Sequence, residues 1–116
     1  MKNFIQGGDV LTVSAPPLGV KSGYPVVIGE IFGVASNDAQ AGEVVAVAVE
    51  GVFALPKLPG AVATGDKVYW QSAQAAPPKD PGVTKTPDGN KLIGVATQDA
   101  APQATEVIVR LNGAFL

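Results

Sequence analysis

Cysteine and histidine are both absent from this sequence of 116 residues. Without cysteine the chain forms no disulfide bond and carries no thiolate nucleophile or thiolate metal ligand. Without histidine it lacks the side chain that most often acts as a general base near neutral pH. A Ser–Lys pair using Ser14, Ser22 or Ser72 is one remaining nucleophilic option, but no nucleophile-elbow motif surrounds these serines. The composition therefore predicts a protein that is not an enzyme and has no metal site and no cofactor.

Positive charge and long apolar runs are also scarce. The net charge is −2, and Arg110 is the only arginine, so no basic stripe is available to bind the phosphates of a nucleic acid. No run of about 20 apolar residues is present, so we expect no membrane span. The opening MKNFIQGGD has one lysine and too short an apolar stretch for a signal peptide, which predicts synthesis in the cytoplasm without export.

Aromatic residues make up only 6% of the chain, and most of its apolar residues are valine and alanine. A core of such small side chains is easier to build between sheets than between long helices. The 14 glycines and 10 prolines interrupt almost every apolar run and leave little room for a helix of ordinary length. The length is that of one ordinary domain.

The segment from Glu43 to Lys57, EVVAVAVEGVFALPK, has the clearest periodicity. Alternate residues place Val45, Val47 and Val49 on one face, and this period of two is typical of a β-strand. Gly51 interrupts the alternation, and Pro56 lacks the N–H group that a central strand would donate. The segment therefore predicts either two strands or one long strand bent at a bulge.

The rest of the chain reads as short strands separated by turns. The sequence predicts strands at 9–14, 24–28, 30–35, 67–71 and 105–111, and a hairpin of 83–86 with 91–93 that continues to 97. Together these segments predict an all-β fold, a small antiparallel β-barrel or sandwich of about eight short strands with long loops and little or no helix. We expect an N-terminal arm at 1–8, a single β domain at 9–113 with a flexible loop at 72–82, and a C-terminal tail at 114–116.

Two segments resemble each other. Residues 33–51 read GVASNDAQAGEVVAVAVEG, and residues 94–113 read GVATQDAAPQATEVIVRLNG. Aligned on their Glu-Val motifs, the second copy has a loop two residues longer and a final strand one residue shorter. This indicates a strand–loop–strand unit used twice, although short valine-rich hairpins also resemble one another by chance.

Asp38 and Asp99 occupy matching places in the two similar segments. A site with paired carboxylates would require these residues to meet across the fold. The simpler interpretation, which we favour, is that each side chain bonds to the backbone of its own loop.

A carrier-domain interpretation rests on residues 41–47, AGEVVAV, which resemble the strand before the modified lysine of biotinyl and lipoyl domains. The nearest downstream lysine, Lys57, lies between Pro56 and Leu58 with no methionine beside it. The resemblance to carrier domains therefore covers the strand but not the modified lysine.

Six residues are candidates for contacts with a partner. Tyr69 and Trp70 are neighbours on a predicted strand, so their side chains point to opposite faces and only one of them is expected in the core. Tyrosine and tryptophan at a protein surface are frequent interface anchors. The two termini add the apolar residues Phe4, Ile5, Phe115 and Leu116.

The chain contains, in this order, the segments MKNFIQGGD, SAPPLGVKSGYPVVIGEIFGVA, DAQAGEVVAVAVEGVFALPK, GDKVYWQ, IGVA and VIVRLNG. In their order and spacing these segments resemble the cement or decoration proteins of tailed-phage capsids. The resemblance covers nearly the whole chain and is weakest over 72–82. It implies a β-rich, non-enzymatic protein that binds the outside of the capsid and stabilises contacts between major capsid protein subunits. It also implies a homo-oligomer, with a trimer favoured and a dimer as the second option, made in the cytoplasm of the host bacterium. The alternative is a small cytoplasmic β-barrel module that binds a peptide or a glycan.

Overall fold

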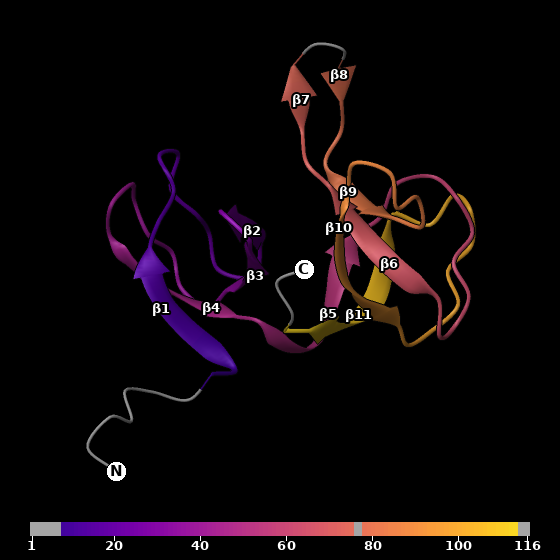
Figure 1. Ribbon diagram of the computed structural model, residues 1–116, viewed down its shortest axis with the longest axis horizontal. Coiled ribbons are helices and arrows are strands. Elements are labelled where there is room, and N and C mark those ends of the chain that lie inside the picture. Colours follow the sequence, from indigo (N-terminus) through magenta and orange to yellow (C-terminus); the bar gives the residue numbers. More distant parts are fainter. Residues whose placement is uncertain (1–7, 76–77, 114–116) are drawn as a thin grey trace. The chain divides into compact units, whose positions relative to one another are not determined.

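The computed structural model describes residues 8–75 and 78–113, apart from the side chains at 78 and 79. This part of the chain folds into strands and turns with no helix, which confirms the all-β prediction (Figure 1). It accordingly offers no helix long and apolar enough to cross a membrane. Two compact units can be distinguished in it, unit 1 up to Gly51 and unit 2 from Val52 onward.

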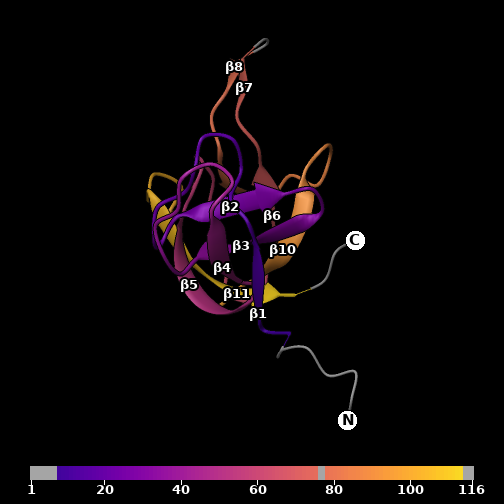
Figure 2. The ribbon, with the colours of Figure 1, turned by 90° about the vertical axis from the view of Figure 1, so that its left-hand side faces the viewer.

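Unit 1 contains one antiparallel sheet of four strands in the order β1-β4-β3-β2 (Figures 1 and 2). Its core is built on the predicted apolar face of β4 and the residue that follows it, since Val45, Val47 and Val49 are at most 2% exposed. The period of two in the sequence is thus confirmed as the pleat of a strand with one buried face. The strands are β1 (Val10–Ser14), β2 (Pro25–Ile28), β3 (Ile31–Ala35) and β4 (Val44–Ala48).

Unit 2 contains a sheet of five strands in the order β5-β11-β10-β6-β9, together with a separate two-stranded ribbon of β7 and β8. Both larger sheets are open, so the barrel alternative is wrong for the described strands. The segment between β6 and β10, in which we expected only loop and hairpin, contains β7, β8 and β9. The strands are β5 (Glu50–Pro56), β6 (Lys67–Gln71), β7 (Gln74–Ala75), β8 (Pro78–Lys79), β9 (Gly82–Thr84), β10 (Lys91–Ala96) and β11 (Glu106–Asn112).

The hairpin predicted between 83–86 and 91–93 is wrong. A turn does form there, since the backbone amide of Asn90 donates to the Pro87 carbonyl at 3.1 Å. However, β9 and β10 both pair with β6, on its two sides, as Trp70 lies opposite Val83 in one ladder and opposite Lys91 in the other. A strand from earlier in the chain thus separates the two arms of the apparent hairpin.

The Glu43–Lys57 segment forms two strands, as the first of our two interpretations predicted. The strand β4 ends at Ala48 and β5 begins at Glu50. The two strands belong to different sheets, so the break at Val49 is also where the chain leaves one sheet for the next.

The two units share a strand order. The order β1-β4-β3-β2 in unit 1 matches β5-β11-β10-β6 in unit 2, and both segments of the internal similarity form an antiparallel strand–loop–strand. Ala35 pairs with Val47, 12 positions later, and Ala96 pairs with Val109, 13 positions later. The second loop is therefore one residue longer than the first, and the two-residue difference that we predicted is wrong.

The correspondence extends upstream of the similar segments. The Gly23 amide donates to the Ala35 carbonyl at 2.8 Å, and the Gly65 amide donates to the Ala96 carbonyl, also at 2.8 Å. Val20 forms an antiparallel bridge with Ala39, as Val62 does with Ala100. Each residue from 10 to 28 therefore corresponds to the residue 42 positions later, and such pairs are called equivalent below.

Candidate interaction surface

Asp38 and Asp99 hold equivalent turns in the two units. The Ser22 amide donates to Asp38 Oδ1 at 2.8 Å. The Thr64 amide and hydroxyl donate to Asp99 Oδ1 at 2.7 and 2.9 Å. The donors lie in the turn before β2 or β6 and not in the aspartate's own loop, which corrects our simpler interpretation. Each carboxylate thus tethers the loop that carries it to a turn of the same unit, and this structural role accounts for both residues.

The pKa values in unit 2 follow from these bonds. The Thr64 amide, and then the Thr64 hydroxyl, lower the pKa of Asp99 below its ordinary value. The Ala63 amide lowers the pKa of Asp66, and so does Lys85, whose Nζ lies 3.1 Å from Asp66 Oδ2. Hydrogen bonds and charges of this kind favour the ionised carboxylate. Neither group has the raised pKa of a general acid.

Lys57, the lysine of the carrier-domain interpretation, is a buried structural residue. Its side chain is 8% exposed, and Nζ donates to three backbone carbonyls, those of Leu58 at 2.9 Å, Gly60 at 2.6 Å and Pro102 at 3.2 Å. An ammonium group has three N–H donors, and all three are used here. The lysine is therefore enclosed within unit 2, whereas a carrier lysine must be displayed at a hairpin tip.

The predicted interaction residues are only partly described. Trp70 is 8% exposed and Tyr69 is half-buried, which agrees with opposite orientations on β6. Phe4, Ile5, Phe115 and Leu116 lie outside the described residues. A role for these six residues in binding stays a prediction. In the part of the chain that can be assessed, no three acidic side chains gather where a metal ion would bind.

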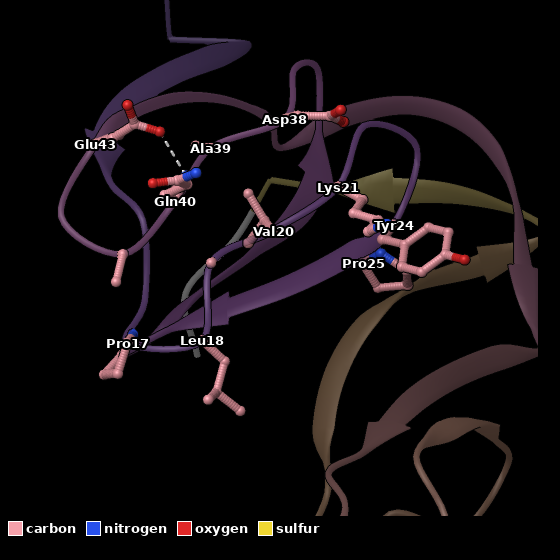
Figure 3. A pocket seen from close by; sticks show the side chains of 12 residues that line it. Pro17, Leu18, Val20, Lys21, Tyr24, Pro25, Asp38, Ala39, Gln40 and Glu43 are labelled. Carbon is pink, nitrogen blue, oxygen red and sulfur yellow. Dashed lines mark hydrogen bonds between the residues drawn. The ribbon is translucent and has the colours of Figure 1, made fainter.

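Two exposed apolar side chains of unit 1 are ones that sequence reasoning missed. Leu18 is fully exposed and Tyr24 is 64% exposed. Both line a surface recess of about 670 Å³ formed by residues 17–25 and 38–43, which we call the unit 1 recess (Figure 3). Figure 3 shows Leu18 and Tyr24 on the rim of this recess. In its wall, the Glu43 carboxylate accepts a hydrogen bond of 2.6 Å from the backbone amide of Gln40.

The equivalent positions in unit 2 are neither large nor apolar. Leu18 corresponds to Gly60, and Tyr24 corresponds to Asp66. The equivalent loop of unit 2, residues 58–62, lies against residues 83–86, and the cavity between them holds only about 120 Å³. Aligning residues 10–28 with 52–70 is the sequence signal that would have identified this difference. The exposed pair is thus specific to unit 1 and is not required by the shared fold.

Comparison with known proteins identifies the family. A family model described as phage cement protein matches residues 5–111, which is nearly the whole chain. No curated protein and no solved structure matches it. The chain therefore belongs to the phage cement protein family, whose name denotes structural proteins of the phage capsid, and the resemblance found in the sequence is confirmed.

Proposed function

We propose that this phage cement protein binds the outside of the capsid and stabilises contacts between major capsid protein subunits, without catalysing a reaction. The observation that carries the proposal is the exposed pair Leu18 and Tyr24, which is present in unit 1 and replaced by Gly60 and Asp66 in unit 2. The shared fold tolerates glycine and aspartate at these places. The leucine and the tyrosine are therefore explained by contact with another molecule.

The energetics of such a contact suit a cement protein. Burying a fully exposed leucine side chain contributes roughly 1.5–3 kcal/mol. Tyrosine is enriched among the residues that dominate binding energy at interfaces. A modest contact is sufficient on a shell, because many copies bind one particle and each copy that bridges two subunits gains from effective concentration.

The first test is the composition of purified particles of the cognate phage. We expect a copy number proportional to that of the major capsid protein, and particles prepared without the protein should lose their genome at a lower temperature. Quantitative mass spectrometry and thermal release of DNA measure the two outcomes. Absence of the protein from particles would contradict the proposal.

The second test concerns the unit 1 recess. Tyr24→Asp introduces the residue that unit 2 has at the equivalent position, and we expect it to weaken binding to shells at least tenfold. Val44→Glu is the matched control, because Val44 is 66% exposed, does not line the recess and lies where unit 2 has the exposed Glu106. Sedimentation of the protein with empty shells measures both affinities. Equal losses in the two variants would argue against the recess.

We also propose that the protein acts as a homo-oligomer, with a trimer favoured over a dimer because a trimer matches the three-fold points of a capsid. Light scattering on the purified protein determines its molar mass directly. A monomer both in solution and on the shell would contradict this part of the proposal.

A further inference from the structure

The two units differ at one edge of their sheets. In unit 2 the outer edge of β6 is covered by β9, with Tyr69 opposite Thr84, Trp70 opposite Val83, and Gln71 opposite Gly82. In unit 1 the equivalent strand β2 ends the sheet, and no strand of residues 8–75 or 78–113 pairs with its outer side. The same edge is therefore covered in one unit and open in the other.

The strand β9 also fills the space beside this edge. Val83 is fully buried, forms a bridge with Lys57, and its carbonyl accepts a bond of 2.9 Å from the Leu58 amide. Gly82 packs so closely on the Leu58 side chain that an added Cβ would lie 2.8 Å from it. The strand β9 is thus bonded to β6 on one side and to the residues that follow β5 on the other. In unit 1 the residue equivalent to Lys57 is Ala15, which follows β1. No described strand lies between Ala15 and β2 in the way that β9 lies between Lys57 and β6.

The backbone of β2 is suited to receive such a segment. The Tyr24 carbonyl accepts a bond of 3.0 Å from the Ala35 amide and therefore points toward β3. Peptide groups alternate in direction along a strand, so those of Val27 point away from β3, toward the open side. Pro25 lies on the same side, where its missing N–H is not needed by the sheet. Val27 is 37% exposed, and Tyr24 and Pro25 join the edge to the unit 1 recess.

We propose that an extended segment of the major capsid protein adds to β2 as an antiparallel strand, as β9 adds to β6. This inference rests on the proposed function and names the structural element through which the capsid is bound. Addition of a strand to an open sheet edge supplies main-chain hydrogen bonds, and the alternate side chains supply specificity. The β9 register predicts the chemistry of the segment within β2, with an apolar β-branched residue opposite Ile28 and any strand former opposite Val27.

A second copy of the chain is a poorer donor than the capsid protein. A segment placed like β9 is engaged on both sides, by β6 on one side and by Lys57 and Leu58 on the other. Every described strand of three or more residues in a second copy already pairs within its own sheet, so it has at most one side free. The strands β7 and β8 have only two residues each, fewer than the three of β9. The capsid subunit is therefore the partner to which we assign the added strand.

The test removes one N–H group from the open edge. Val27→Pro deletes the outward amide of β2, and we expect at least a tenfold loss of binding to empty shells assembled from the major capsid protein. Val10→Pro is the matched control on β1, the other edge strand of the same sheet. Val10 is 38% exposed, and its amide also points outward because the Asp9 carbonyl bonds the Val49 amide at 2.9 Å. Circular dichroism checks that both variants fold, and we expect Val10→Pro to bind within twofold of the wild type.

Hydrogen exchange on the unmodified protein tests the same point without a substitution. We expect the Val27 amide to exchange at least tenfold more slowly in the shell-bound protein than in the free protein, while the Val10 amide is unchanged. Binding of the wild type to shells with no change at Val27 and full binding by Val27→Pro would overturn the strand addition and leave the cement function standing. Failure of the wild type to bind shells would overturn both. A change in molar mass of Val27→Pro with full shell binding would assign the edge to a second copy and also overturn the inference.

Discussion

Units 1 and 2 have the same order of four strands and the same turn tethers, yet among the residues that the structure describes only unit 2 carries a fifth strand, an enclosed lysine and a covered edge. Unit 1 instead presents an exposed leucine, an exposed tyrosine and an open strand. The features in common are those that the fold requires, because each recurs with the same hydrogen bonds. The features that differ serve two purposes. Those of unit 2 stabilise its fold, and those of unit 1 are available to bind a partner.

The largest expected effects come from a glycine that the two units share. Gly33 and Gly94 lie opposite Val26 and Val68, and an added Cβ would collide with the carbonyl oxygen of residue 48 or 110 in the neighbouring strand. A backbone atom in a sheet cannot move aside as a side-chain tip can. We expect Gly33→Ala and Gly94→Ala each to lower the free energy of unfolding by about 2–3 kcal/mol.

Urea denaturation followed by circular dichroism measures these two losses, and Trp70 fluorescence reports on unit 2. Gly8→Ala is the control, since no atom lies within 4 Å of an added Cβ there. If either of the two core variants were as stable as Gly8→Ala, the equivalence of the two glycines would be refuted.

The next effect should be confined to unit 2. Lys57→Met keeps most of the length of the side chain but removes the donor shared by the carbonyls of Leu58, Gly60 and Pro102, of which Pro102 still accepts a bond of 3.0 Å from the Gly60 backbone amide. Loss of buried, charge-assisted hydrogen bonds typically costs about 1.5–3 kcal/mol. We expect a loss in this range by urea denaturation. Lys67→Met makes the same change on an exposed residue of β6, and a comparable loss there would show that charge alone is responsible.

The turn tethers should contribute less, and unequally. Asp99 accepts two bonds from Thr64, whereas Asp38 accepts one from Ser22. At pH 7 we expect Asp99→Ala to lower the melting temperature more than Asp38→Ala, and both to lower it less than Lys57→Met. Equal shifts in the two aspartate variants would show that the second bond contributes nothing.

The Asp99 tether should also depend on pH. Because the bonds from Thr64 lower the folded-state pKa of Asp99 below its ordinary value, its stabilising effect is fully present above the unfolded-state pKa. This effect is lost as the pH falls through the lower, folded-state pKa. We therefore expect the difference in melting temperature between the wild type and Asp99→Ala to be constant from pH 7 to about 5 and to shrink below about pH 4. A difference that stays constant down to pH 2 would contradict this assignment.

The smallest effect on stability is expected at the exposed pair. Leu18→Ser removes a side chain that is fully exposed, and substitutions at such surface positions usually change stability by less than about 0.5 kcal/mol. Thermal melts measure the change. A larger loss would show that Leu18 serves the fold of unit 1 and would weaken its assignment to binding.

Local patterns predicted the strands well. The alternation around Val45, Val47 and Val49 was sufficient because the direction of a side chain in a strand depends only on its position in the run. The turns also lay where glycine, proline and aspartate indicated. The internal similarity was recognised only over 33–51 and 94–113. Upstream, equivalent residues such as Leu18 and Gly60 have different chemistry although their backbones make the same kind of bonds.

Pairing and exposure were predicted less well. The turn at Pro87–Asn90 suggested a hairpin, but β6 takes the place between β9 and β10. The chemistry of Leu18 alone predicts burial, and only its position in a loop that no described strand covers leaves it exposed. The pairing error concerns strands whose shared partner is distant in the sequence, and the exposure of Leu18 was not predicted.

The sequence by itself determined the β class of this cement protein, the buried face of β4 and the absence of cysteine and histidine chemistry. These follow from residue types and from a period of two, which act over a few neighbouring residues. Only the tertiary structure decided which strands pair, that Lys57 is enclosed, and that the edge of β2 stays open while the edge of β6 is covered. Such choices depend on non-local contacts, in which packing and hydrogen bonds must offset the entropy of closing long loops, and no short stretch of sequence contains that balance.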